Sequence, residues 1–435
     1  MISISHRIEL CPNNKQKTYF RKACGCSRLA WNWAVAECNR LREQKQKVDI
    51  YELKKQFNAI KKTEFPFVCE VTKYAVQEPF LDLKDALTAY YNKKAGYPKF
   101  KKKKLLEGSF YIGADQIRLS YENTNSKAFE SMPHNLMHKH QYLYIPKLGC
   151  VKMHECLRFH GKINGVRIVQ HAGKFFAAFS LSITEEEFKR THSWANGTGE
   201  GALAIDIGVG EPIVVSSGLG VKNQHFSKKD QKRIASYQRK LSKRVHAKTK
   251  QERLDRVASS KNYLKLSLKI GRLKLKEANR RHDFINKVTT VLTMSCKEIA
   301  METLATKNMM KNHRLAGSIA DVSFYEIRRQ IEYKAAYSGV NVTKADKWYP
   351  SSKTCSCCGN VVQKLSLSQR IYSCTNCGLQ IDRDLNAAIN LRNLISKEKI
   401  GTGRPDFTPV ELLIAGFERN RIVIRNIEAG KQHKL

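Results

Sequence analysis

The chain has no long apolar run and few acidic residues for its length. No stretch approaches the roughly 20 apolar residues of a membrane-spanning helix, and the opening MISISHRIELC lacks a signal peptide's apolar core. We therefore expect an intracellular protein without membrane contact. Only 39 Asp and Glu accompany 78 Lys and Arg, which leaves a formal net charge of +39. Because solubility needs far less charge, the expected partner is a polyanion, with nucleic acid as the first candidate.

The 435 residues are enough for two to four domains, and 42% of them are hydrophobic. The first half predicts a strand over Ile2–Leu10, helices between Lys15 and Tyr91, and a β-rich region over Phe110–Ile183. Gly173 lies between two alternating runs and suits a hairpin turn. We expect a β-barrel or sandwich that begins with the first strand and carries the helical bundle as an insertion. Residues 184–201 suggest a linker.

The second half alternates strands and helices. An apolar strand ends at Asp206 and a second strand follows over Pro212–Ser216. Between Val221 and Arg281, 21 Lys and Arg face 4 Asp and Glu, which predicts basic helices. The remaining elements that we expect are an apolar strand before Glu302, a helix over Ile319–Tyr337, a strand over Asn341–Lys344, a helix over Asp384–Leu394 and a partly disordered tail.

Thirteen cysteines are scattered over the chain, and four of them form two Cys-x-x-Cys pairs. Cys355 with Cys358 and Cys374 with Cys377 are separated by 15 residues, which is typical of a tetrahedral structural Zn²⁺ site. An iron–sulfur cluster or a redox centre is the alternative. Cys357 lies inside the first pair and is interpreted as a bystander. We expect Cys24, Cys26, Cys38 and Cys296 to be buried thiols.

Three acids stand at the edges of predicted elements: Asp206, Glu302 and Asp384. The order strand pair, helical insertion, strand, helix, strand, helix resembles the RNase H-like fold, in which such carboxylates converge and bind two Mg²⁺ (or Mn²⁺) ions. Two such ions suit phosphodiester hydrolysis. Alternatively, Asp384 is only a helix N-cap, with Asp382 as the competing catalytic acid. Asn386 could orient a carboxylate or contact the substrate.

A basic segment that includes Gly96-Tyr-Pro interleaves aromatic residues with lysines, as phosphate-binding surfaces do, although it could also be a solvated loop. Together with the basic helices it predicts a set of nucleic-acid-binding residues. These are Lys93, Lys94, Tyr97, Lys99, Lys101, Lys102, Lys103, Arg239, Lys243, Arg244, Arg280 and Arg281.

Four motifs surround these acids and cysteines: Ile-Asp206-Ile-Gly, Ala-Met-Glu302-Thr-Leu, Trp348-Tyr-Pro-Ser-Ser-Lys-Thr-Cys-Ser-Cys-Cys-Gly and Asp382-Arg-Asp-Leu-Asn-Ala-Ala-Ile-Asn. They resemble the motifs of the TnpB family, transposon-encoded RNA-guided DNA endonucleases related to miniature type V CRISPR effectors. Looser matches are Arg28-Leu-Ala-Trp-Asn-Trp-Ala and Gly96-Tyr-Pro-Lys-Phe-Lys. The resemblance favours Asp384 over Asp382. One departure is Gly210-Glu-Pro, where the family has a more regular turn.

The resemblance also implies a multidomain α+β organisation. In this organisation, a β-barrel wedge domain comprises 1–11 and 105–190, and a helical recognition lobe comprises 12–104. A linker over 191–200 leads to a RuvC (RNase H-like) nuclease domain over 201–347 and 381–396. The nuclease domain carries an inserted zinc ribbon over 348–380, and a basic tail over 397–435 follows.

The implied function is cleavage of double-stranded DNA next to a short flanking motif, in the prokaryotic cytoplasm, directed by a structured guide RNA. Asp206, Glu302 and Asp384 would be both catalytic and Mg²⁺-binding, and a monomer is favoured. A type V CRISPR effector, a nuclease-dead DNA-binding protein, a transposase and a plain RNA-binding protein are the alternatives. A nuclease-dead chain would be expected to lack one of the acids, and a plain RNA-binding protein leaves them unexplained.

Overall fold

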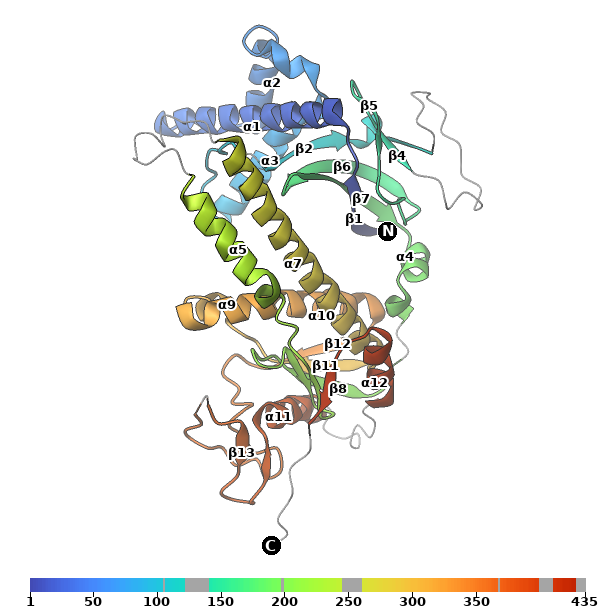
Figure 1. Cartoon of the computed structure of the whole chain (residues 1–435), viewed down its shortest axis with the longest axis vertical. Helices are drawn as coiled ribbons and strands as arrows, with labels where there is room; N and C mark the ends of the chain where they lie inside the picture. The colour runs from blue at the N-terminus through green and yellow to red at the C-terminus, as the bar shows by residue number, and fades with distance from the viewer. Residues whose placement is uncertain are drawn as a thin grey trace. The chain divides into compact units, whose positions relative to one another are not determined.

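The computed structural model describes seven ranges of the chain: 1–104, 106–121, 141–196, 199–244, 260–366, 368–398 and 410–427 (Figure 1). Its contacts divide it into two units. The first unit is Met1–Thr191 with Val245–Arg272, and the second is His192–Arg244 with Leu273–Leu435. No helix in the described ranges combines the length and apolarity needed to cross a bilayer.

An antiparallel sheet of four strands organises the first unit, in the order β1-β7-β6-β2. Its strands are β1 (Ile2–Leu10), β2 (Glu107–Gly113), β6 (Lys162–His171) and β7 (Lys174–Ile183). The predicted first strand and its place in this sheet are confirmed. Ala172 and Gly173, with φ of 50° and 75°, form the turn from β6 to β7, where the left-handed conformation favours glycine.

The expected barrel is not found in the described part of the first unit. A second sheet contains β3 (Arg118–Ser120), β4 (Tyr142–Ile145) and β5 (Gly149–Lys152), and no strand ladder joins it to the four-stranded sheet. A single antiparallel bridge between Leu10 and Met153, beside a hydrogen bond from the Cys11 N–H to the Lys152 carbonyl, joins the end of β1 to the end of β5. The described strands therefore form two sheets that touch at one bridge, and no closed barrel. Alternation of apolar and polar residues predicts a half-buried strand, but it does not determine whether the last strand returns to the first.

The predicted helices follow β1. They are α1 (Asn14–Glu43), α2 (Ile50–Ile60), a 3₁₀ turn over Pro66–Glu70 and α3 (Tyr74–Tyr91), and a short α4 (Glu185–Thr191) follows the sheet. Asn13 caps α1 in a reciprocal pair of hydrogen bonds with Gln16. Trp33 and Phe80 pack against Phe57, with ring centroids 5.2 and 5.5 Å away, so these aromatic residues unite the three helices.

A mixed sheet of six strands lies in the second unit, in the order β12-β11-β8-β9-β10-β15. The parallel strands are β8 (Ala202–Asp206), β11 (Glu298–Met301) and β12 (Asn341–Lys344). The antiparallel strands are β9 (Ile213–Val215), β10 (Leu219–Val221) and β15 (Ile424–Asn426). The helices are α5 (Phe226–Ser242), α7 (Lys261–Met294), α8 (Thr306–Met309), α9 (His313–Val322), α10 (Phe324–Ser338), α11 (Arg383–Glu398) and α12 (Val410–Arg419). The residues of α7 through Arg272 belong to the first unit.

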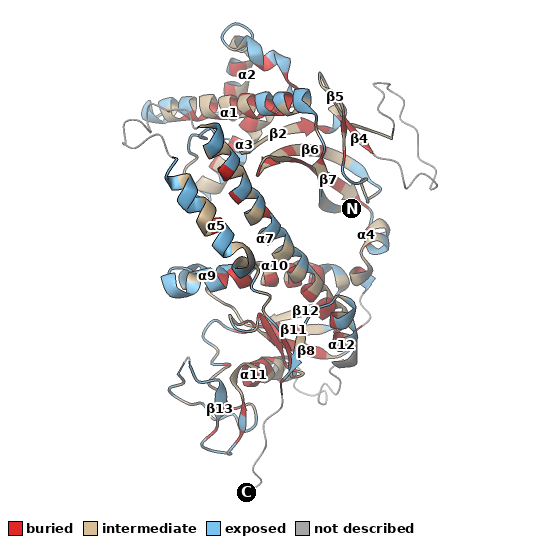
Figure 2. Cartoon of the chain, in the orientation of Figure 1, coloured by how far each residue is buried: buried red, intermediate tan, exposed pale blue. Residues whose placement is uncertain are grey.

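The two faces of this sheet differ in side-chain size. Leu203 and Ile205 of β8 join the larger core with residues of α7, α10 and α12 (Figure 2). Ala202 and Ala204 lie in a second cluster with Leu391 of α11. Successive side chains of a strand point to opposite faces, so the alanines leave room for α11 to lie close to the sheet.

Two predicted boundaries differ from the structure. The helix expected over Ile319–Tyr337 is divided at Ser323, whose φ of 61° ends α9 before α10 begins. The tail expected to be partly disordered contains α12 and β15 within 410–427. Leu413 and Phe417 of α12 are fully buried, because these apolar residues complete the larger core of the second unit. The remaining tail residues lie outside the described ranges.

Candidate metal centres and catalytic edge

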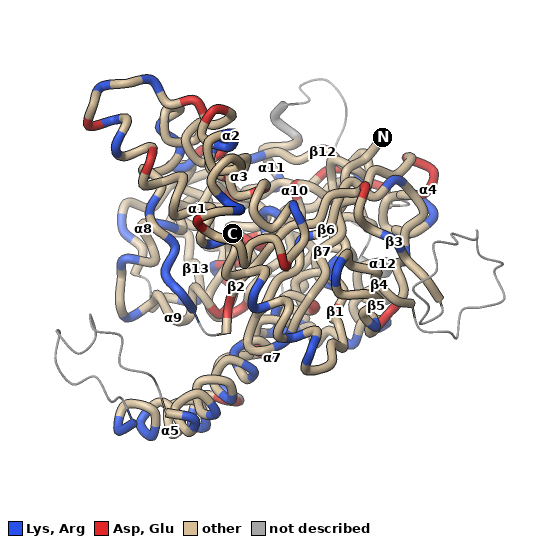
Figure 3. The backbone as a smooth tube through the Cα atoms, turned by 90° about the horizontal axis from the view of Figure 1, so that it is seen from above, with Lys and Arg blue, Asp and Glu red and all other residues tan. Residues whose placement is uncertain are grey.

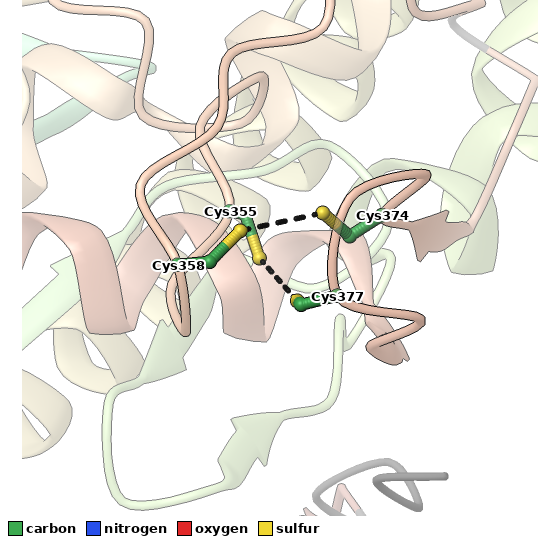
Figure 4. Close-up of side chains that lie close together, drawn as sticks. All are labelled: Cys355, Cys358, Cys374 and Cys377. Carbon is green, nitrogen blue, oxygen red and sulfur yellow. Dashed lines mark hydrogen bonds between the residues drawn. The ribbon is translucent and has the colours of Figure 1, made fainter. Parts of the chain in front are cut away.

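Four cysteine sulfurs gather in the segment before α11. The Sγ atoms of Cys355 and Cys377 lie 3.6 Å apart, as do those of Cys358 and Cys374, and all four lie within 4.8 Å of one another (Figure 4). A tetrahedral Zn²⁺ ion with Zn–S bonds of about 2.3 Å places its sulfurs about 3.8 Å apart. The cysteines therefore fit a structural zinc ion, and Cys357 lies outside the group.

The two Cys-x-x-Cys turns repeat one backbone design. The Gly359 N–H donates to the Cys355 carbonyl and the Gly378 N–H donates to the Cys374 carbonyl, each at 3.0 Å, and both glycines have positive φ. Hydrogen bonds from the Asn360 backbone N–H and then from the Asn376 side chain are the main causes that lower the pKa of the Cys358 thiol to about 6. Because zinc binds the thiolate, these hydrogen bonds favour the ligating form. The strands β13 (Ile371–Ser373) and β14 (Gln380–Asp382) flank the second turn.

Two asparagines of α11 fasten this helix to the first turn. The Asn386 amide donates to the Thr354 carbonyl at 2.7 Å and accepts from the Ser356 N–H at 3.0 Å. Asn390 donates to the same Thr354 carbonyl at 2.6 Å and to the Ser351 carbonyl at 2.8 Å. Both side chains are buried. The hydrogen bonds of Asn386 thus link α11 to the cysteine turn, a structural role that the sequence did not suggest.

Asp206 and Glu302 lie at one edge of the six-stranded sheet. Ile205 of β8 is paired with Met301 of the parallel strand β11. The residues that follow them, Asp206 and Glu302, therefore lie side by side at the same end of the two strands. Asp206 continues the alternation of Ala202 and Ala204 and therefore points to the face that α11 covers. Asp384 lies in the first turn of α11. The fold thus brings the three predicted acids to one end of the sheet.

The environment of these acids opposes their negative charge. Burial, and then repulsion by Glu302 and Asp384, raises the pKa of Asp206 well above its usual value. Burial raises the pKa of Glu302 to about 7, although the Ile207 backbone N–H lowers it in part. Burial and repulsion by Asp382 raise the pKa of Asp384. A bound cation would relieve this repulsion, and carboxylate oxygens are the ligands that Mg²⁺ and Mn²⁺ prefer.

Asp382, not Asp384, caps α11. Its Oδ1 accepts from the Asp384 N–H at 2.9 Å and from the Leu385 N–H at 3.2 Å, as an N-cap side chain does. The alternative in which Asp384 is the N-cap is therefore wrong. The Arg370 guanidinium lies 3.6 Å from the Asp384 carboxylate. Within the described ranges, the cysteines are the group of ligands that already lies within metal-binding distance, and the three carboxylates do not form such a group.

Two residues at this edge were missed by sequence reasoning. Arg425 of β15 donates from Nε to Glu211 Oε1 at 2.8 Å, and another nitrogen of Arg425 lies 3.8 Å from Asp382. Glu211 belongs to the Gly-Glu-Pro departure in the β8–β9 turn and packs over Gly220, where a Cβ would meet it at 2.3 Å. Only the pairing of β15 with β10 brings Arg425 here, and no local pattern signals that pairing.

In the first unit, the predicted basic segment is fastened to α1. Trp31 Nε1 donates to the Lys99 carbonyl at 3.0 Å, and Asn32 exchanges two hydrogen bonds with the Lys101 backbone, at 2.7 and 3.1 Å. The Lys101 Nζ lies 3.6 Å from the Trp31 ring centroid, and desolvation of this ammonium group lowers the pKa of Lys101. Tyr97 is half-buried beside Arg42. The predicted lysines here, Lys93, Lys94, Lys99, Lys101, Lys102 and Lys103, are all exposed by surface area.

The predicted basic residues of the second unit fall into two groups. Arg239, Lys243 and Arg244 are exposed in and after α5, along which Figure 3 shows several basic residues. Arg280 and Arg281 are only partly exposed. Arg280 lies 3.7 Å from Asp230, and Arg281 pairs with Glu277 at 2.6 Å. The two groups therefore differ in how much of their charge is already paired with acids of the protein.

Three family models match parts of the chain. "Helix-turn-helix domain" matches 1–47, which contain the strand β1 and the long helix α1, "Probable transposase" matches 187–313, and "Cas12f1-like, TNB domain" matches 324–391. The last segment contains all four clustered cysteines and Asp384. These matches lie on both halves of the chain.

Full-length relatives are also found. A "Putative RNA-guided DNA endonuclease" of Streptomyces pristinaespiralis is 26% identical over 87% of this chain and 86% of its own length. "Putative RNA-guided DNA endonuclease InsQ" of Escherichia coli K12 is 27% identical over 92% of this chain and 95% of its own. The "CRISPR-associated endodeoxyribonuclease Cas12f1" of Sulfoacidibacillus thermotolerans is 34% identical over 24% of each chain.

Among solved structures, a mini-RNA-guided endonuclease, CRISPR-Cas_phi3, covers 93% of this chain and 94% of its own at 10% identity, with a TM-score of 0.46. This score is too low to support an argument about the fold. The "TnpB-like protein L79" of Acanthamoeba polyphaga mimivirus is 29% identical over 31% of this chain and 26% of its own. The resemblance inferred from the motifs is confirmed by the family models and the curated relatives, and the chain is related to the TnpB-like proteins.

Proposed function

We propose that this protein is an RNA-guided DNA endonuclease that cleaves double-stranded DNA next to a short flanking motif. The observation that carries the proposal is the position of Asp206, Glu302 and Asp384 at one end of a mixed sheet, beside a four-cysteine cluster. The named relatives that align with about nine tenths of the chain support the same activity. The alignments cover 86% and 95% of these two relatives' own lengths, so this chain corresponds to most of each relative.

The three carboxylates would bind and orient divalent metal ions in a RuvC-type nuclease domain over 201–347 and 381–396. Their raised pKa values fit this role, because a bound cation favours the ionised form of each acid. The chemistry that bound Mg²⁺ or Mn²⁺ supplies is the activation of water and the stabilisation of the leaving oxygen. In the reaction a phosphorus–oxygen bond to water forms, the bond to the 3′ oxygen breaks, and this oxygen receives a proton.

The cysteine cluster would hold a structural Zn²⁺ ion within the ribbon 348–380. Its role is to fix α11, because Asn386 and Asn390 join this helix to the first cysteine turn. The exposed lysines and arginines would bind the phosphates of a guide RNA and of target DNA. These residues would belong to a recognition lobe over 12–104, a wedge domain over 1–11 and 105–190, and the basic helices. Pairing of guide and target would then select the sequence.

The test is to express the chain with its native flanking locus, sequence the RNA that co-purifies and offer the complex a DNA library with randomised flanks. We expect one discrete RNA, cleavage beside a short motif, and loss of cleavage in Asp206→Ala with guide and target binding retained. Absence of a discrete RNA, or normal cutting by Asp206→Ala, would overturn the proposal.

A transposase is the second candidate, because the model over 187–313 is described as a probable transposase. The same carboxylates could join a DNA 3′ end to a target strand, so the two reactions differ in their products. Strand-transfer products in the cleavage assay would favour the transposase. A repeat array beside the locus would instead favour a type V CRISPR effector, whose guide is CRISPR-derived.

A further inference from the structure

Two cavities of the second unit meet at Glu302. One encloses about 400 Å³ and the other about 230 Å³. Both are lined by Glu302, Leu304 and Ala305, so the segment after β11 separates them and the proposed catalytic acid belongs to both. The larger volume falls within the range of about 300 to 1,000 Å³ that small-molecule sites occupy. A chain-like ligand that occupied both cavities would therefore pass this carboxylate.

An aromatic ring and two cations line the larger cavity. Tyr325, near the start of α10, is 63% exposed although it lines the cavity, and Phe324 beside it is buried. Lys307 is exposed on the opposite segment, and Arg328 lies one turn after Tyr325. The Glu332 carboxylate, 3.3 Å from the Arg328 Nε, partly neutralises that guanidinium. Lys307 is thus the better candidate for contact with a phosphate.

A similar pair borders the smaller cavity. Lys347 and Tyr349 line it, and Trp348 between them is 79% exposed. The Trp348 backbone N–H donates to Asp346 Oδ1 at 2.8 Å, which fixes the turn that presents the indole to solvent. The Lys347 Nζ lies 4.5 Å from the centroid of the indole ring. Burial of an indole ring would stabilise the fold, but the Trp348 ring is exposed and contributes little to packing. Its exposure beside a lysine therefore suggests contact with a ligand.

We propose that these cavities bind single-stranded DNA at the cleavage edge, with one base stacked on Tyr325 and another on Trp348. Lys307 and Lys347 would contact the phosphates between or beside these bases. Exposed aromatic rings that alternate with cations are the usual means of binding single strands, and a base can stack on a side chain only when it is unpaired. Tyr325 and Trp348 are positioning residues in this proposal, which rests on the proposed nuclease function.

Photochemical crosslinking tests the contacts without requiring cleavage. The full-length protein is irradiated with a single-stranded DNA oligonucleotide that carries 5-iodouracil, and the crosslinked peptides are identified by mass spectrometry. We expect adducts at Tyr325 and Trp348 in the wild type and in Asp206→Ala. Tyr337 is the matched control for Tyr325, because it lies on the same helix and is 39% exposed but, unlike Tyr325, lines neither cavity. Trp348 lies between Lys347 and Tyr349, which line the smaller cavity, although it does not line the cavity itself. Adducts at Tyr337 and at neither proposed residue would overturn the proposal.

Affinity measurements separate stacking from charge. At a salt concentration that weakens phosphate contacts, Tyr325→Ala and Trp348→Ala should each bind single-stranded DNA roughly tenfold more weakly. Tyr325→Phe, Trp348→Phe and Tyr337→Ala should retain wild-type affinity. The dependence of affinity on salt should be unchanged in every variant, because no charge is removed. Equal losses in Tyr337→Ala, or no loss in either proposed variant, would contradict the assignment.

The outcomes distinguish this inference from the nuclease proposal. If Asp206→Ala abolishes cleavage but the crosslinks are absent, the stacking site is wrong and the nuclease proposal stands. If Asp206→Ala cleaves normally, the nuclease proposal fails whatever the crosslinks show. Crosslinking of an iodouracil RNA of the same sequence in preference to DNA would overturn the choice of DNA as the ligand.

Discussion

The four clustered cysteines come from one short segment, 355–377, whereas the three edge carboxylates come from β8, the end of β11 and the start of α11. Local backbone hydrogen bonds close each cysteine turn, so their sulfurs already lie at distances that suit an ion. The carboxylates repel one another and depend on long-range strand pairing for their positions. One site is built locally from one segment, and the other is assembled by the fold from three distant segments.

The strongest test of this comparison removes a carboxylate. Glu302→Gln should lower the rate of DNA cleavage by at least about a thousandfold, because it removes a charged ligand and leaves the fold in place. Zinc content, measured by elemental analysis, should equal that of the wild type. A parallel loss of zinc would show that the two sites are not independent.

The converse change removes a thiol. Cys374→Ser should lose the bound zinc and destabilise the segment 348–380, because three cysteines and a hydroxyl bind zinc less tightly than four thiolates. Cys357→Ser is the matched control, since Cys357 is exposed and lies outside the cluster. Elemental analysis and thermal unfolding measure both effects. Unchanged zinc content in Cys374→Ser would refute the assignment of the ligands.

The hydrogen bonds that join α11 to the first cysteine turn can be removed one side chain at a time. Asn386→Ala removes a donor and an acceptor, so the free energy of unfolding should fall by about 2 kcal/mol or more. Asn390→Ala removes donors alone, and about 1 kcal/mol is expected. Denaturant unfolding and the rate of zinc release to a chelator are the measurements. Faster release from Asn390→Ala than from Asn386→Ala would contradict the ranking.

The last test separates Asp382, which caps α11, from Asp384 in its first turn, and the changes in stability that it expects are the smallest. Asp382→Ala should cost about 1 kcal/mol of stability, and Asp382→Ser almost nothing, because serine also caps a helix. Asp382→Ser should still cleave DNA at a rate near that of the wild type. Asp384→Asn should keep the wild-type stability and lose cleavage. Loss of cleavage in Asp382→Ser with normal cleavage in Asp384→Asn would exchange their roles.

The same contrast explains which features the sequence could predict. The first strand, the β6–β7 turn and the cysteine pairs are local patterns, and the structure has them where the residues indicate. The convergence of Asp206, Glu302 and Asp384 was inferred from the order of the elements and from the family resemblance. Two features depend on distant pairing: the arrangement of the first unit's described strands as two sheets without a closed barrel, and the contact of Arg425 with Glu211. No short window of sequence encodes such pairings.

The strand β15 has a practical consequence for shortened versions of the protein. It covers the outer edge of β10, and α12 before it fills the larger core of the second unit with Leu413 and Phe417. Truncation before Val410 would leave the N–H and C=O groups of β10 unpaired and expose apolar side chains. Such a chain would be prone to edge-to-edge aggregation, so a minimised version of the protein should retain the residues through 427.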